Sequence, residues 1–402
     1  MKKKFLSVLL IVAVLIGMAG VSGTQTESGE QKADKEQKQQ ENEQTAETKV
    51  EIPPENEEEQ KGWIGVILNG DETEAYTLAH IDGIRAAAEN VSLPEQDIIW
   101  KERVGANDGC KSAVKDLIRQ GCEIIIANSA IEEAIKSEAE KNPEIDFVVI
   151  NDSKTQSTVT EDGTELTNLY NVHMDTYEAS YVAGVTAGMK VAKLKEKKKI
   201  PAKSFDEKKN VKLGYVAAEA NDDAHADINA YYLGVKAVCK KVVLQVEYID
   251  AWNNSDAEAT AAGDLIRSGC VVLASNTDLD AVMQMAENAK ESGKCVYAVG
   301  RNSDMRQMAG KAALTSVVSV WSVYYTELFD AKLNGRYMEQ NWNGGYAQGA
   351  VTISTLGKSA SSGTGDRVKK TEEKIKNGKK QIAYFSTRAL DGILESEKGQ
   401  EQ

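Results

Sequence analysis

Side chains that could bind a flat heteroaromatic molecule follow most of the predicted strands of this chain. They are amides, carboxylates and aromatic rings, which together can hydrogen-bond to the edge of a ring system and stack on its faces. The candidate ligand-binding residues are Asn69, Asp71, Tyr76, Asn128, Ser129, Trp252, Asn276, Asp278, Asn302, Asp304 and Trp321. Any Asn or Asp taken alone is better explained as a helix cap. The prediction therefore rests on their recurrence at equivalent strand ends, where ligands bind parallel α/β sheets.

Two of the five tryptophans are placed to form aromatic walls of that site. Trp252 and Trp321 each follow a predicted strand, and core packing is the alternative explanation for both. Asp278 and Asn302 are the expected polar readers of the ring edge. The set suits a neutral ligand with several hydrogen-bond donors and acceptors.

The chain lacks the sequence signatures of catalysis, metal binding and cofactor binding. It contains no GxSxG, HExxH or GxGxxG motif. The three histidines share no spacing of a metal site or triad, so we expect them on the surface or in hydrogen-bonded packing. Five cysteines without a CxxC pair indicate neither a zinc site nor a disulfide framework. We therefore expect a binding protein without a cofactor and not an enzyme.

An internal repeat shows what positions these residues. Residues 116–128 read Asp-Leu-Ile-Arg-Gln-Gly-Cys-Glu-Ile-Ile-Ile-Ala-Asn, and residues 264–276 read Asp-Leu-Ile-Arg-Ser-Gly-Cys-Val-Val-Leu-Ala-Ser-Asn. Each copy is the end of an amphipathic helix, a Gly stop and a short apolar run that closes on Asn. This pattern is typical of a helix that leads into a buried parallel strand. Two copies predict two similar α/β lobes with a ligand cleft between them.

Alternating strand and helix patterns fill both halves of the chain, as expected for doubly wound lobes. The first half has predicted strands at 63–68, 97–100, 123–127 and 146–150, with helices at 109–120 and 130–140 and one after residue 71. A helix at 175–189 has a face of Ala and Gly that suits close packing, and Asp175 with Glu178 resembles a capping box. The second half has strands at 211–217, 242–249, 271–274, 295–299 and 312–318, with helices at 226–239, 256–268 and 279–292. Ser255 with Glu258 forms a second predicted capping box.

Length and composition indicate two domains behind an exported N-terminus. A chain of 402 residues is too long to fold around a single hydrophobic core. Three lysines, an apolar run and small residues make residues 1–23 a signal sequence or membrane anchor. Residues 24–60 hold almost no apolar side chains and are expected to be a disordered acidic tether. Lobe 1 is assigned to 61–175 with part of 312–345, and lobe 2 to 176–311 with part of 346–402. The formal net charge of −14 argues against nucleic acid as a partner.

Several segments make the chain resemble the basic membrane protein family, the purine nucleoside receptor-like solute-binding components of ABC transporters. The matching segments are Tyr-Glu-Ala-Ser-Tyr-Val-Ala-Gly-Val-Thr-Ala-Gly at 177–188, Gly-Tyr-Val-Ala-Ala at 214–218, Asn-Ala-Tyr-Tyr-Leu-Gly at 229–234, Ser-Asn-Thr-Asp at 275–278, Asn-Ser-Asp-Met at 302–305, and 314–325. The resemblance covers about 61–356 and implies a type I periplasmic-binding-protein fold. It further implies lobe closure on a purine base or nucleoside, an ABC permease as partner and an extracytoplasmic location. We expect a monomer.

Three departures from the family pattern qualify this resemblance. Val21 stands where family lipoproteins carry the lipidated Cys. In nucleoside-binding relatives an Asp that holds ribose hydroxyls and an accompanying Lys occupy positions that are Asn302 and Ser319 here. Their loss suggests a ligand without ribose, or one held differently. A membrane-tethered sensor that signals to a partner protein through the same fold is the alternative function.

Overall fold

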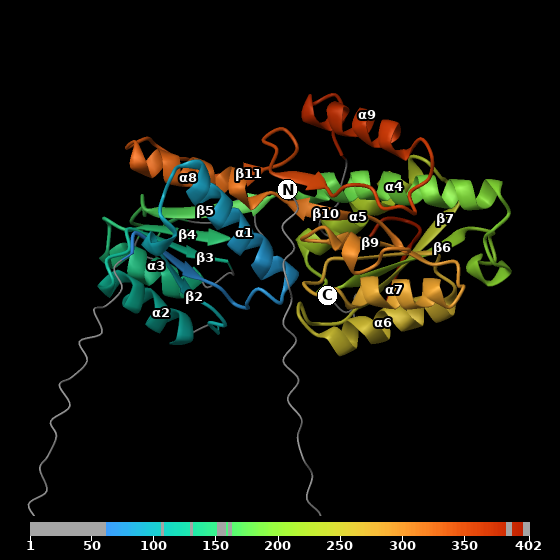
Figure 1. Ribbon diagram of the computed structural model, residues 1–402, viewed down its shortest axis with the longest axis horizontal. Helices are drawn as coiled ribbons and strands as arrows, with labels where there is room; N and C mark the ends of the chain where they lie inside the picture. Colours follow the sequence, from blue (N-terminus) through green and yellow to red (C-terminus); the bar gives the residue numbers. More distant parts are fainter. Residues whose placement is uncertain are drawn as a thin grey trace, which may run out of the picture. The chain divides into compact units, whose positions relative to one another are not determined.

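Two sheets of mostly parallel strands organise the described part of the chain (Figure 1). The computed structural model describes residues 62–105, 108–128, 132–150, 158–159, 163–382 and 388–396. The predicted signal segment and tether, and Ser129, lie outside these residues. Among the helices within these ranges, none combines the length and the apolar character that crossing a bilayer requires.

The first sheet has the strand order β11-β5-β4-β3-β1-β2, and all of its neighbouring strands are parallel. Its strands are β1 (Ile64–Ile67), β2 (Ile98–Lys101), β3 (Ile124–Ala127), β4 (Asp146–Ile150), β5 (Leu169–Met174) and β11 (Asn341–Gly344). The helices that connect them are α1 (Ala75–Asn90), α2 (Asp108–Arg119), α3 (Glu132–Lys141) and α8 (Trp321–Leu333), with a 3₁₀ turn η1 (Glu95–Asp97). The predicted order of β1 to β4 and of the helices between them is confirmed, whereas β5 and β11 were not predicted.

The second sheet has the order β12-β10-β9-β8-β6-β7-β13, with only the β10–β12 pair antiparallel among its described strands. Its strands are β6 (Val211–Ala217), β7 (Val242–Tyr248), β8 (Val272–Ser275), β9 (Tyr297–Arg301), β10 (Ala313–Ser319), β12 (Val351–Ile353) and β13 (Ile393–Glu395). The accompanying helices are α4 (Thr176–Glu196), α5 (Asp222–Lys236), α6 (Ser255–Ser268), α7 (Ala281–Glu291) and α9 (Thr364–Lys376), with the 3₁₀ turns η2 (Ala202–Ser204) and η3 (Met305–Gln307). In this sheet α9 and β13 were not predicted from the sequence.

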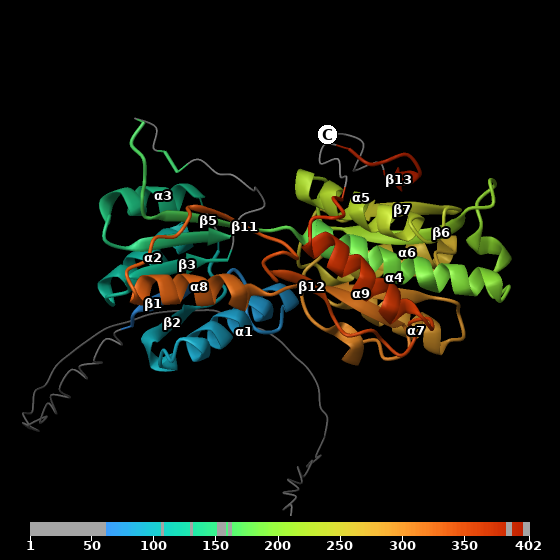
Figure 2. The same cartoon turned by 90° about the horizontal axis from the view of Figure 1, so that it is seen from above.

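Each sheet is covered by helices on both faces. In β1, Ile64 and Val66 pack with apolar residues of α1, whereas Ile67 packs with those of α2 and α3. Figure 2 shows α8 beside α1 over the first sheet. In the second sheet, α4 and α5 cover one face and α6 and α7 the other. This arrangement places the carboxyl ends of the strands, where the candidate residues lie, at the edges left open by the helices.

The internal repeat forms the same local structure twice, as predicted. In the first copy α2 ends at Arg119, the turn passes through Gly121 with φ +85°, and β3 follows. In the second copy α6 ends at Ser268. Gly269, which has φ +104°, then leads into β8. The left-handed backbone at both glycines is strained for other residues, so the Gly stop is what turns each helix into its strand.

The small-residue face of α4 packs closely against α5, as the sequence analysis expected. A Cβ atom at Gly184 would lie 2.1 Å from the carbonyl oxygen of Tyr231, and one at Gly234 would lie 2.0 Å from that of Tyr181. Such distances are far below van der Waals contact. Substituting either glycine would therefore separate the two helices, which carry cavity residues.

Neither predicted capping box forms. The side chain of Asp175 makes no capping hydrogen bond to α4, and Asn254, not Ser255, caps α6 by accepting a hydrogen bond from the backbone N–H of Ala257 at 3.0 Å. Glu258 accepts a hydrogen bond from the backbone N–H of Leu279 at 3.3 Å instead. The capping prediction was wrong because a tertiary partner takes the Glu258 carboxylate.

The chain passes between the two sheets more than once. It moves from β5 in the first sheet to α4, which packs against α5 of the second sheet. After β10 it returns to the first sheet for α8 and β11, and β12 then pairs with β10. The residue boundaries assigned to the two lobes stay a prediction.

Candidate functional site

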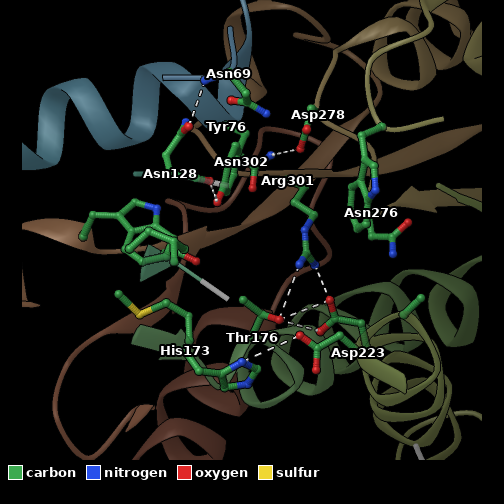
Figure 3. A pocket seen from close by; sticks show the side chains of 17 residues that line it. Asn69, Tyr76, Asn128, His173, Thr176, Asp223, Asn276, Asp278, Arg301 and Asn302 are labelled. Atoms are coloured by element: carbon green, nitrogen blue, oxygen red, sulfur yellow. Dashed lines mark hydrogen bonds and ion pairs between the residues drawn. The ribbon is translucent and has the colours of Figure 1, made fainter. Parts of the chain in front are cut away.

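A cavity of about 270 Å³ lies where residues of both sheets meet (Figure 3). Its polar and aromatic lining matches the small-molecule sites of other proteins, where a few placed polar groups orient a ligand among apolar ones. The lining residues are Asn69, Tyr76, Asn128, Ile150, His173, Met174, Thr176, Asp223, Ala224, Asp227, Trp252, Asn276, Asp278, Arg301, Asn302, Ser319 and Trp321.

Eight of the eleven candidate residues line this cavity. They are Asn69, Tyr76, Asn128, Trp252, Asn276, Asp278, Asn302 and Trp321. Both sheets contribute to the set, as the strand-end argument expected. Ser129 is outside the described residues, and the other two candidates lie elsewhere.

Asp71 and Asp304 do not line the cavity, and short-range contacts explain where each goes. Asp71 accepts hydrogen bonds from the hydroxyl and backbone N–H of Thr73 and pairs with Arg103. These Thr73 hydrogen bonds, followed by the Arg103 charge, hold the pKa of Asp71 below its ordinary value despite partial desolvation. Asp304 accepts from the backbone N–H and guanidinium of Arg306 at the start of η3. Asp71 and Asp304 therefore act locally, in a turn and at a helix cap.

Asn128 and Asn276 occupy equivalent positions and make equivalent hydrogen bonds. The Oδ1 atom of Asn128 accepts from the backbone N–H of Asn69 at 2.9 Å, and that of Asn276 accepts from the backbone N–H of Ala218 at 2.9 Å. Each Asn thus fixes the loop that follows the first strand of its own sheet. The Nδ2 atom of Asn128 is buried without a hydrogen-bond partner among the described residues. A buried amide donor of this kind is available to a ligand.

An aromatic group forms one wall of the cavity. Trp321, the first residue of α8, is only 5 % exposed and stacks on His80, with ring centroids 4.0 Å apart. Tyr76 meets Trp321 edge to face at 6.4 Å, and its hydroxyl donates to the carbonyl oxygen of Asn128 at 2.8 Å. Burial lowers the pKa of His80 to about 3, so the imidazole is neutral near pH 7. This wall therefore offers flat surface without charge.

A charged network forms the opposite wall. Asp227 on α5 is buried and accepts hydrogen bonds from Thr176 at 3.0 Å and Ser180 at 2.8 Å. Its Oδ2 atom also pairs with Nη1 of Arg301 at 2.5 Å. Burial opposes the Arg301 charge, but Asp227, Tyr215 and Asp278 together raise the pKa of the guanidinium. Figure 3 shows Arg301 reaching from the end of β9 into the cavity.

Asp278 links the loops of the two sheets at this cavity. Its backbone carbonyl accepts from the N–H of Ala75 at 3.2 Å, and its own N–H donates to the carbonyl oxygen of Trp252 at 2.8 Å. Asn302, whose φ of 66° is unusual for a residue with a side chain, donates from Nδ2 to Oδ1 of Asp278 at 3.4 Å. Burial raises the pKa of Asp278 to about 7, against the opposing influence of Arg301.

Sequence reasoning missed the residues that reach the cavity from helices. Asp227 lies within α5, away from any strand end, so the strand-end rule passes over it. Thr176 begins α4 two residues after β5, a strand that was not predicted from the sequence. A usable signal was present, because Asp223 and Asp227 lie four residues apart and so on the same face of α5. Arg301 is the last residue of β9 and directly precedes the candidate Asn302, so its position at a strand end could have identified it. His173 also lines the cavity, where only surface or packing roles were expected.

Comparisons with known proteins agree with this architecture. The family model "Bmp: ABC transporter substrate-binding protein PnrA-like" matches residues 73–385. A purine-binding protein of Brucella abortus is 28 % identical over 283 residues, which cover 69 % of this chain and 70 % of that protein. A Haloferax volcanii protein that carries a provisional name as an ABC transporter glucose-binding protein is 27 % identical over 54 % of this chain and 49 % of its own length.

Solved structures support the same fold. An ABC transporter solute-binding protein from Aeropyrum pernix matches with a TM-score of 0.63 and 14 % identity, over 79 % of this chain and 92 % of that one. At this identity the likeness concerns the fold alone. It confirms the predicted α/β periplasmic-binding-protein fold.

Proposed function

Because the chain belongs to the Bmp family of ABC transporter substrate-binding proteins, we propose that its cavity captures a purine base and presents it to a permease. The observation that carries the proposal is one cavity lined by two tryptophans and by amide and carboxylate groups. Trp321 and Trp252 offer faces on which a purine can stack. Asp278, Asn302 and Asn128 offer donors and acceptors for its edge.

The proposal extends to the mechanism of capture. Residues that line the cavity come from both sheets, so movement of one lobe toward the other would surround a ligand. One side-chain contact already joins loops of the two sheets: Asn253, after β7, donates from its side chain to Glu74, before α1, at 3.4 Å. The N-terminal segment would hold the protein at the membrane, outside the cytoplasm.

The free base is proposed as a better ligand than its nucleoside. Asn302 and Ser319 both line the cavity, and they stand where the resemblance places the Asp and Lys of nucleoside-binding relatives. An amide and a short hydroxyl carry no charge, so they offer weaker hydrogen bonds to ribose hydroxyls than a carboxylate and an ammonium group. Matched calorimetric titrations with hypoxanthine and inosine test this. A nucleoside that binds more than about tenfold tighter would contradict it.

A thermal-shift screen of residues 61–402 tests the purine proposal. Hypoxanthine, guanine, adenine, their nucleosides and glucose would each be added at saturating concentration. A ligand at a hundred times its dissociation constant adds roughly 2.7 kcal/mol to the free energy of unfolding, which is a readily measured shift. At least one purine should raise the melting temperature and glucose should not. A melting temperature raised by glucose alone, or unmoved by every purine, would contradict the proposal.

A further inference from the structure

The guanidinium of Arg301 is a buried, preorganised hydrogen-bond donor that faces the cavity. Its side chain is 14 % exposed, and that of its ion-pair partner Asp227 is 2 % exposed. Asp227 is fixed by hydroxyl donors from Thr176 and Ser180, so both of its oxygens are already engaged by the protein. These contacts engage both oxygens of Asp227 and hold Arg301 in place.

Donors of Arg301 remain for a ligand after these contacts are counted. A guanidinium has five N–H groups. Nη1 uses one on Asp227, and Nη2 reaches the hydroxyl of Thr176 at 3.4 Å, a long contact. Because Asp227 already balances the charge, a neutral oxygen acceptor is a better partner for the remaining donors than a second anion.

The opposite side of the cavity also presents a donor. Asn128 lines the cavity, and its Nδ2 atom is buried and has no hydrogen-bond partner among the described residues. Asn128 itself is 1 % exposed. A ligand with one acceptor near Arg301 and a second within reach of Asn128 would pair both donors, and a ligand without them would leave a donor unpaired.

We propose that Arg301 makes this site selective for 6-oxopurines, such as hypoxanthine and guanine, over the 6-aminopurine adenine. This inference rests on the proposed function. The exocyclic oxygen of a 6-oxopurine accepts a hydrogen bond from the guanidinium, and a ring nitrogen accepts from Asn128. The exocyclic amino group of adenine would set donor against donor at Arg301, and the lost hydrogen bond is of the charged, stronger class.

Isothermal titration of the full chain with hypoxanthine and with adenine tests the selectivity. The wild-type protein should bind hypoxanthine about ten- to a hundredfold more tightly, the range given by one hydrogen bond to a charged donor. Adenine that binds as tightly as hypoxanthine, or more tightly, would overturn the inference while leaving the purine proposal intact. Failure of both bases to bind would instead contradict the proposed function.

Two variants assign the selectivity to Arg301. The double variant Arg301→Met with Asp227→Asn removes both charges together, so no buried carboxylate is left unpaired. It should bring the ratio of the hypoxanthine and adenine affinities close to one, mainly because hypoxanthine binding is weakened. Arg301→Lys keeps the charge but not the planar fork, and should give an intermediate ratio. Thermal melting identifies the folded variants to be titrated. Wild-type selectivity in the folded double variant would overturn the assignment.

Discussion

The two walls of the cavity share a backbone device but differ in chemistry. Asn128 and Asn276 stand at equivalent places in the repeat, and each fixes the first loop of its own sheet. Around the first Asn the cavity is lined by neutral aromatic rings, among them Tyr76 and Trp321. Around the second it is lined by the side chains of Asp278 and Arg301, together with one aromatic ring, that of Trp252.

This difference indicates a division of roles between the walls. The repeat preserves what shapes the loops, whereas the side chains that would meet a ligand have diverged. Stacking depends little on which purine is bound, since every purine has a flat face. Hydrogen bonds to a charged group discriminate between donors and acceptors. We therefore assign affinity mainly to the aromatic rings, including Trp252, and selectivity to the charged wall.

Removing Arg301 while keeping its partner Asp227 should have the largest effect, which is on the free energy of unfolding. Arg301→Met leaves Asp227 buried and without its counter-ion, and loss of one partner of a buried pair costs about 3–5 kcal/mol. Urea unfolding measures the change. Adding Asp227→Asn should recover most of the loss, because the uncompensated charge is gone. A single variant as stable as the wild type would show that the pair does not organise this wall.

The pH dependence of stability should change when Asp278 is replaced. Its folded-state pKa of about 7 lies above the ordinary carboxyl value, mainly because of burial. The folded state therefore holds the proton more tightly, so this contribution to stability is complete below about pH 4 and is lost as the pH rises through about 7. Asp278→Asn should remove this contribution. Between pH 4 and pH 8 the free energy of unfolding of the variant, relative to that of the wild type, should therefore rise by roughly 4 kcal/mol.

Asp304→Asn is the matched control for this measurement. Asp304 lies outside the cavity, and its hydrogen bonds with Arg306 lower the pKa of its carboxyl. That variant should keep the decline between pH 4 and pH 8. A decline of equal size in wild type and Asp278→Asn, measured by urea unfolding across this range, would refute the assignment to Asp278.

Removing one aromatic face should weaken binding more than folding. Trp252 lines the cavity and is half-buried, so Trp252→Ala should cost roughly 1–3 kcal/mol of binding free energy through lost stacking. Trp342, packed on Tyr324 away from the lining residues, is the control, since Trp342→Ala should lower the melting temperature and spare affinity. Calorimetry on both folded variants separates the roles. Wild-type affinity in Trp252→Ala would place the ligand elsewhere.

Restoring the family pattern at the charged wall should have the smallest effect. Asn302→Asp with Ser319→Lys places a carboxylate and an ammonium group beside the cavity. The ratio of inosine to hypoxanthine affinity should rise by about tenfold, or roughly 1.4 kcal/mol. Competition titration measures the ratio. A ratio unchanged in the folded double variant would mean that these positions do not set ribose recognition.

The fold could be read from the sequence largely because its signals are local. The repeat at 116–128 and 264–276, with a helix, a Gly stop and an apolar strand, defines each unit within a few residues. Parallel pairing then brings strand ends such as Asn276 and Asn302 together without further information.

The site was less predictable because its remaining residues depend on tertiary contacts. Asp71 shares the strand-end pattern, yet Thr73 and Arg103 hold it outside the cavity. Asp227 enters the cavity only because α5 packs against α4 at a distance that Gly184 permits. The small-residue face of α4 predicted the close approach, but neither its partner helix nor the Asp227–Arg301 pair is visible in a pattern along one element.

The central claim is that a purine stacks on Trp252 and Trp321. Its most direct test is intrinsic tryptophan fluorescence, measured during titration with hypoxanthine. The wild-type signal should change saturably at one ligand per chain. Trp252→Phe and Trp321→Phe should each lose part of that change while retaining binding by calorimetry, because phenylalanine still stacks. Full wild-type change in the variant that lacks both tryptophans, or no saturable change in the wild type, would contradict the account.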